Sequence, residues 1–185
     1  MCDQTAQRAT YEDLMQVPDH LVAEIIDGVL YSLPRPAVPH ANAASELGVT
    51  LGGAFRSRSG GPGDWKFLDE PELHVGQDIV VPDLAGWRRE RMGRLPNAAY
   101  LEIVPDWVCE VLSPSTKRLD RGNKMVVYAR EGVSHLWLID PIRRTLEVYE
   151  RDDGLWRPVA LFGDSAVVRA VPFDTIEIDL AWLWI

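Results

Sequence analysis

Two acidic side chains lie inside stretches of the chain that are otherwise apolar. Asp83 ends the stretch 80–83, directly after a proline, and Glu110 lies within the apolar run 107–112. A buried carboxylate is costly unless it is paired, hydrogen-bonded or bound to a metal. If both stretches form neighbouring strands, the two carboxylates could hold one divalent cation, and such oxygen ligands suit Mg²⁺ or Mn²⁺. Alternatively, each carboxylate lies at a strand edge and meets solvent or an arginine.

The elements ahead of Asp83 follow from caps, turns and hydrophobic periodicity. We expect a short helix over 10–14 with Thr10 as its N-cap, and a hairpin over 22–33 around the turn 27–28, which is Asp-Gly. The prolines at positions 34, 36 and 39 break the chain. Apolar residues at helical spacing then predict a helix over 40–55.

The remaining segments alternate strand and helix signals in an irregular order. We expect two strands over 65–75 and 79–87 joined by a turn at 76–78, a strand over 107–112, a helix from about 116 to 130 that ends near Gly132, strands over 135–140 and 146–149, and a further hairpin in the tail. The order is not a regular βαβ array. It predicts an α/β fold of the mixed α+β kind, in which a mixed sheet is flanked by helices, in a single domain over 1–185.

Composition and charge restrict the function classes. The net charge of −9 weighs against a non-specific nucleic-acid binder, because affinity for phosphate comes largely from Lys and Arg. However, the stretch 85–130 holds nine basic and five acidic residues, so one face could still be basic. The two cysteines have no paired spacing, no apolar stretch reaches membrane-spanning length, and the polar first ten residues lack a signal core. We therefore expect a cytoplasmic protein.

An ordered set of motifs resembles a known family. The set comprises Val-Pro-Asp at 81–83, the run Glu-Val-Leu-Ser-Pro-Ser-Thr at 110–116, and Asp120, Lys124 and Tyr128. It extends upstream through 24–28 and His40, and downstream through Gly132 and 137–141. In this arrangement the chain resembles the Uma-type putative restriction endonucleases of the PD-(D/E)XK nuclease superfamily, most strongly over residues 11–150. The resemblance implies a restriction-endonuclease-like core.

The resemblance also implies roles for individual residues. Asp83 and Glu110 would bind Mg²⁺ or Mn²⁺, helped by a backbone carbonyl beside Glu110, and the metal would activate a water molecule for attack on DNA. The superfamily pattern places a lysine two residues after the glutamate, but this chain has Leu112 there, on the same strand face. Lys124 is the candidate replacement, on one helix face with Asp120. Alternatively, Lys124 is an exposed lysine that only pairs with Asp120.

Two further residues could support such a site. The resemblance suggests that Glu24 lines the metal site, although an edge carboxylate at this position could equally be solvated. His40 precedes the predicted helix over 40–55, where a role at the helix N-terminus competes with a contact to phosphate.

Three functions remain open on the sequence alone. The leading hypothesis is a metal-dependent endonuclease that hydrolyses DNA phosphodiester bonds, and it requires the Asp83 and Glu110 carboxylates to lie on the same side of the sheet. The second is a decayed nuclease-like module that binds nucleic acid or another partner, which Leu112 and the net charge favour. The third is a hydrolase that uses its carboxylate pair on another substrate, such as a glycosidase. The Trp-rich tail 181–185 also predicts an apolar patch that a second copy could cover, so we expect a homodimer.

Overall fold

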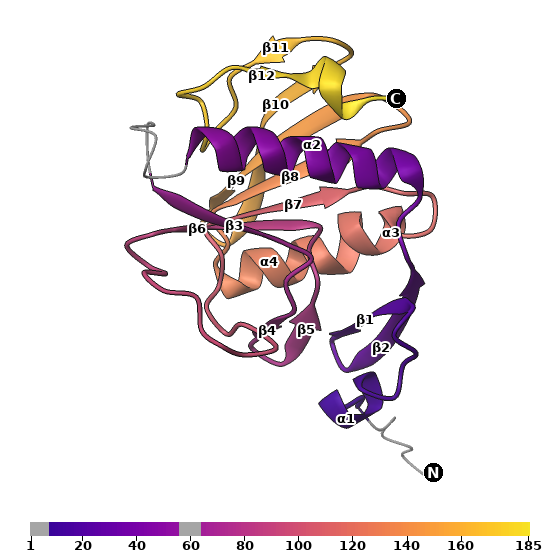
Figure 1. Cartoon of the computed structure of the whole chain (residues 1–185). Helices are drawn as coiled ribbons and strands as arrows, with labels where there is room; N and C mark the ends of the chain where they lie inside the picture. The colour runs from indigo at the N-terminus through magenta and orange to yellow at the C-terminus, as the bar shows by residue number, and fades with distance from the viewer. Residues whose placement is uncertain (1–7, 56–63) are drawn as a thin grey trace.

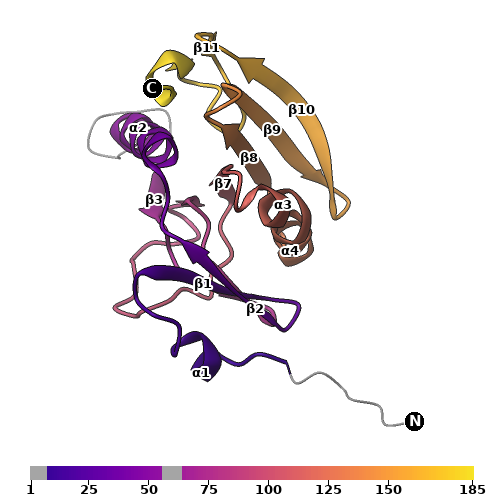
Figure 2. The ribbon, with the colours of Figure 1, turned by 90° about the vertical axis from the view of Figure 1, so that its right-hand side faces the viewer.

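A six-stranded mixed sheet forms the centre of the protein, and helices cover both of its faces (Figures 1 and 2). The computed structural model describes residues 8–55 and 64–185. The strand order is β10-β9-β8-β7-β6-β3, with β7 and β8 parallel and the other neighbours in the described sheet antiparallel. The strands are β3 (Trp65–Asp69), β6 (Leu84–Arg88), β7 (Trp107–Val111), β8 (His135–Asp140), β9 (Thr145–Asp152) and β10 (Leu155–Gly163). The predicted mixed sheet flanked by helices is confirmed.

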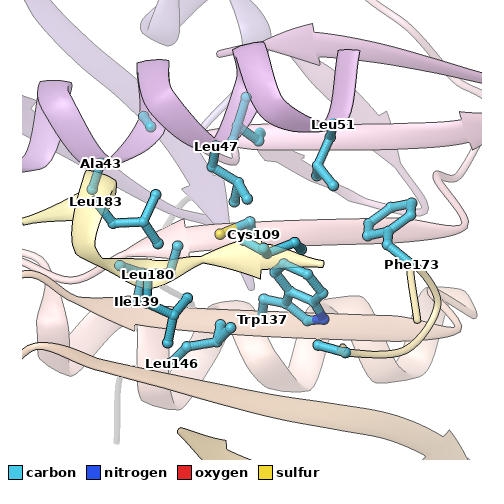
Figure 3. Close-up of a cluster of buried hydrophobic side chains, with 14 of the residues drawn as sticks. Ala43, Leu47, Leu51, Cys109, Trp137, Ile139, Leu146, Phe173, Leu180 and Leu183 are labelled. Atoms are coloured by element: carbon cyan, nitrogen blue, oxygen red, sulfur yellow. The ribbon is translucent and has the colours of Figure 1, made fainter. Parts of the chain in front are cut away.

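Helix α2 (Val38–Ala54) covers one face of this sheet. Its buried Leu47 and Leu51 point toward Cys109 and Trp137 of the sheet (Figure 3). The C-terminal segment, with β11 (Val167–Val168), β12 (Ile178–Asp179) and the 3₁₀-helix η3 (Leu180–Leu183), closes the same core. The predicted helix therefore exists, but the expected break at Pro39 is wrong. This proline lies in the first turn of α2, where its missing N–H would have had no helical partner.

The opposite face is covered by one continuous helical run from Lys117 to Glu131. It consists of α3 (Lys117–Leu119), a π-helical segment η2 (Asp120–Lys124) and α4 (Met125–Glu131), and Gly132 ends it with a left-handed φ of 94°. The sequence predicted this helix and its glycine stop, but not its π-helical part. Short π-helical insertions in α-helices often coincide with functional sites.

The long hairpin predicted over 65–87 is divided between two sheets. Strands β3 and β6 belong to the large sheet, whereas β4 (Leu73–Val75) and β5 (Asp78–Val80) join a smaller one, so the prediction of two uninterrupted strands is wrong. The pairing register is nevertheless the same in both halves, with Trp65 opposite Arg88 and Leu73 opposite Val80. Pro82 lies at the interruption and cannot donate a ladder hydrogen bond, so the chain leaves one sheet there and enters the other.

The smaller sheet has the order β2-β1-β5-β4 and carries the N-terminal hairpin. Strands β1 (Leu21–Ile26) and β2 (Val29–Pro34) meet at Asp27-Gly28, where both residues have positive φ, as the predicted tight turn requires. Helix α1 (Tyr11–Leu14) begins with the predicted Thr10 cap. Within the described residues, no helix is both long and apolar enough to cross a membrane.

Candidate active site

Asp83 lies where the chain passes from the small sheet into the large one, directly before β6. Leu84 pairs with Cys109 of antiparallel β7, so the next position along the ladder places Asp83 opposite Glu110. The Oδ2 atom of Asp83 accepts a hydrogen bond from the backbone N–H of Val111 at 2.6 Å. Asp83 and Glu110 both line one cavity of about 280 Å³. The structure therefore brings the two predicted carboxylates to the same side of the sheet.

His40 holds the other oxygen of Asp83. Its Nε2 lies 2.6 Å from Asp83 Oδ1, and the side chain comes from the first turns of α2. An ionised carboxylate only accepts hydrogen bonds, so Nε2 carries the proton when Asp83 is charged. The buried Nδ1 atom of His40 has no hydrogen-bond partner among the described residues. Asp83 is thus fixed from both sides, by a helix and by β7.

Lys124 is buried at the centre of the site, with only 3% of the residue exposed. Its Nζ lies 2.9 Å from the Oε1 atoms of both Glu24 and Glu110, and 3.8 Å from Asp120 Oδ1. It also donates a hydrogen bond of 3.0 Å to the carbonyl of Val81. The alternative of an exposed lysine paired only with Asp120 is therefore wrong. Asp120 and Lys124 are the two ends of the π-helical segment, and both line the cavity.

Glu24 reaches the same cavity from β1 of the small sheet. Its Oε1 accepts a hydrogen bond of 2.7 Å from the N–H of Val81, in addition to the contact with Lys124. Only 1% of the residue is exposed, so the alternative of a solvated edge carboxylate is wrong. The second oxygen, Oε2, is buried and finds no hydrogen-bond partner in the described part of the chain. An unpartnered buried carboxylate oxygen is costly and indicates a place for a cation or water.

The ionisation of this cluster is strongly perturbed. Burial raises the pKa of Glu110 well above its usual value, although the charge of Lys124 opposes the rise. Burial likewise raises the pKa of Asp120 to about 6. For Lys124, burial lowers the pKa, but the charges of Glu110 and Glu24 outweigh it and raise the pKa above the usual value. Tyr128, whose hydroxyl donates to Glu110 Oε1 at 2.5 Å, has a pKa raised by burial. Perturbed groups gathered in one cavity are typical of functional sites.

Comparison with known proteins places the chain in a family. A model of the Uma2 family, described as putative restriction endonuclease, matches residues 8–181. The chain belongs to this family. Among solved structures, the chain is similar to the crystal structure of a putative nuclease belonging to DUF820 from Anabaena variabilis ATCC 29413. That similarity has a TM-score of 0.77 at 23% identity and covers 95% of this chain and 99% of the other. Curated proteins gave no significant match.

The restriction-endonuclease-like fold expected from the sequence is therefore confirmed. Restriction-endonuclease-like families generally use divalent metals. This member of the Uma2 family departs from the PD-(D/E)XK pattern at Leu112, which is 2% exposed and packs in the core between the sheet and α4. Position 112 therefore supplies packing and no charge. The buried cation of the site comes instead from Lys124, twelve residues later on the helix.

The residues of this site fit a divalent cation in part. Five carboxylates line the cavity, namely those of Glu24, Glu70, Asp83, Glu110 and Asp120, and one buried oxygen of Glu24 is unpartnered. Within the described residues, however, no three His, Cys, Asp or Glu side chains already form a metal-binding group. The ammonium of Lys124 lies among three of the five carboxylates. Carboxylate oxygens are the kind of donor that hard divalent cations prefer.

Proposed function

We propose that this Uma2-family protein is a cytoplasmic, divalent-metal-dependent endonuclease that hydrolyses DNA phosphodiester bonds. The observation that carries the proposal is the meeting of Asp83 and Glu110 on one side of the sheet, in one cavity with Lys124. The two carboxylates come from segments 27 residues apart, and their own hydrogen bonds orient them. If these residues served structural packing alone, apolar side chains at the same buried positions would stabilise the fold more.

Asp83 and Glu110 would hold Mg²⁺ or Mn²⁺, together with a backbone carbonyl beside Glu110. A bound divalent cation would lower the pKa of a water molecule, and it would also place positive charge opposite the phosphate. His40 and the N–H of Val111 keep the Asp83 carboxylate oriented toward the cavity. Glu24 supports the site from the small sheet, where its free Oε2 can accept a hydrogen bond from water. The protein thus contributes preformed geometry around the cation.

Lys124 would serve as the lysine that the superfamily pattern places two residues after the glutamate. In the structure, its ammonium balances the charge of Glu24 and Glu110. With a divalent cation held by Asp83 and Glu110, the same ammonium would orient the attacking water or neutralise a phosphate oxygen. Lys124→Ala tests this role: we expect cleavage to fall at least tenfold, because a charge-assisted contact contributes about 1.5–3 kcal/mol. Unchanged cleavage would assign the role to another cation.

The proposal is tested by plasmid nicking in millimolar Mg²⁺ or Mn²⁺. We expect wild type to nick DNA, and Asp83→Ala and Glu110→Ala to lose the activity. Calorimetry with Mn²⁺ should show binding to wild type and loss of binding in Asp83→Ala. The matched control is Glu102→Ala, since Glu102 is an exposed acid outside the cavity. Wild type that neither nicks DNA nor binds Mn²⁺ would overturn the proposal.

A second candidate is a nuclease-like module that binds DNA without cutting it. The buried Leu112 favours it, because the position two residues after Glu110, where the superfamily pattern has the lysine, cannot act on phosphate. Retained DNA binding by a wild-type protein that never nicks DNA in either metal would support this candidate. Cleavage that depends on Asp83 would exclude it.

We also propose that the protein forms a homodimer through its C-terminal end. Trp182 and Ile185 are 67% and 68% exposed, which leaves large apolar surfaces in contact with water. Sedimentation of wild type and Trp182→Ser measures the oligomeric state directly. We expect a dimer that the substitution weakens, and a monomeric wild type would contradict the proposal.

A further inference from the structure

An ion pair stands at the wall of the active-site cavity. Arg35 lies in the link between β2 and α2, and Glu70 follows β3. Arg35 Nη1 donates to Glu70 Oε2 at 2.8 Å. The arginine side chain is 55% exposed, and that of the glutamate 31%. Exposed pairs of this kind contribute little to stability, so little free energy is needed to separate the two side chains.

The same pair also borders a second cavity. The neighbouring hollow is of similar size, about 280 Å³, and lies beside α1 and β1. Four residues line both cavities, and these are Val22, Arg35, Glu70 and Val81. The pair is therefore part of the partition between the active-site cavity and the hollow. Separation of Arg35 from Glu70 would open this part of the partition.

Of the two partners, Glu70 is the fixed one. Its backbone N–H donates to the carbonyl of Asp83 at 3.1 Å, which ties it to the candidate catalytic segment. Its φ of 43° lies in the left-handed region, which non-glycine residues seldom adopt. Strained backbone of this kind persists where the surroundings enforce it, often at functional sites. Arg35, by contrast, is bound through its long side chain, which can change partner without a change in the backbone.

The charges of the cavity show why a change of partner by Arg35 matters. The described cavity wall carries five acids, Glu24, Glu70, Asp83, Glu110 and Asp120. Its basic residues other than His40 are Lys124, which is buried, and Arg35, which reaches solvent. An approaching phosphodiester meets like charge on this wall unless a cation faces it. The guanidinium fork matches phosphate oxygens and is suited to this contact.

We propose that Arg35 is a phosphate-binding residue of the active site and that Glu70 competes with DNA for it. The inference rests on the proposed function and specifies how the DNA backbone is held. In the free protein, Glu70 engages the guanidinium. On binding, a backbone phosphate replaces Glu70, and the strand continues from the active-site cavity into the neighbouring hollow.

The test is the affinity for a labelled DNA duplex, measured by fluorescence anisotropy in Ca²⁺ for wild type, Arg35→Ala and Glu70→Gln. We expect about tenfold weaker binding and a salt slope reduced by about one for Arg35→Ala. Glu70→Gln removes the competitor and should bind DNA several-fold more tightly. The two variants should therefore change the affinity in opposite directions, whereas a merely structural ion pair would give a loss of affinity in both.

A control pair is available in Arg169 and Glu177, an exposed pair at 3.3 Å. Arg169→Ala and Glu177→Gln should leave affinity unchanged. Melting curves for all variants report on folding. Arg35→Lys should bind DNA more tightly than Arg35→Ala if charge alone is needed. Equal losses, or no change, in Arg35→Ala and Glu70→Gln overturn the inference. If Asp83-dependent cleavage persists in that case, only this inference fails and the proposed function stands. If wild type neither binds nor cleaves DNA, both fail.

Discussion

Replacement of Asp120 by asparagine should change how the stability of the metal-free protein depends on pH. Asp120 is 3% exposed and lies at the start of the π-helical segment. Burial raises its pKa from 3.8 to about 6, against the opposing effects of Lys124 and of a hydrogen bond with Thr116. In the unfolded chain the carboxyl returns to its ordinary pKa. Asparagine has nearly the same shape but cannot ionise.

The magnitude follows from the difference between the two pKa values. A shift of about two units at about 1.4 kcal/mol each amounts to about 3 kcal/mol. Because the folded pKa is the higher one, the folded state binds the proton more tightly. The stability from this group is therefore complete below about pH 4 and is lost as pH rises through about 6. Asp120→Asn lacks this loss. Relative to wild type, the free energy of unfolding of the variant should therefore rise by about 3 kcal/mol from pH 4 to pH 7.

Urea unfolding in EDTA at several pH values from 4 to 8 measures the difference. Around 1 kcal/mol corresponds to about 2–4 °C in a protein of this size, so melting temperatures should diverge by about 6–12 °C across the range. The exposed Asp174 supplies the control, since Asp174→Asn should follow wild type at every pH. A difference between wild type and Asp120→Asn that is the same at pH 4 and pH 7 would refute the reasoning.

Three further substitutions test packing and local contacts by urea unfolding. Leu47→Ala should cost about 2–5 kcal/mol, because Leu47 is fully buried between α2 and the sheet, whereas Val49→Ala on the exposed side of the same helix should change little. Tyr128→Phe removes the donor to Glu110 and should cost about 1–3 kcal/mol, and an unchanged midpoint would show that the bond is not formed in solution. Gly132→Ala meets no neighbour within 4 Å, so any loss, expected near 1 kcal/mol, reports the left-handed φ alone.

Local sequence signals predicted the parts of the fold that local physics determines. The Asp-Gly turn at 27–28, the Thr10 cap and the glycine stop at 132 each depend on a few neighbouring residues. Helix α2 followed from apolar spacing. The division of the 65–87 hairpin could not be predicted in this way, because both halves keep one register and one alternation. Pro82 lies at the break, but the second sheet exists only because β5 pairs with β1, which is a long-range contact.

The candidate site was predictable in its residues but not in its connections. Asp83, Glu110 and Lys124 were found because buried charges within apolar stretches and the family pattern single them out. The contacts of Lys124 with Glu24 join residues 100 positions apart, and the π-helical turn that directs Lys124 inward has no sequence signature. The Arg35–Glu70 pair was missed entirely. Its partners are ordinary surface residue types, and only the folded chain places them on the cavity wall.

The short passage 81–83 between the two sheets has a mechanical consequence. Its Val81 holds Glu24 through the N–H and Lys124 through the carbonyl, while Asp83 is anchored to α2 and β7. Any slight separation of the small sheet from the large one pulls these groups apart together. Partial opening between the two sheets would therefore disrupt the proposed active site, while the tryptophans of the main core would still report a folded molecule.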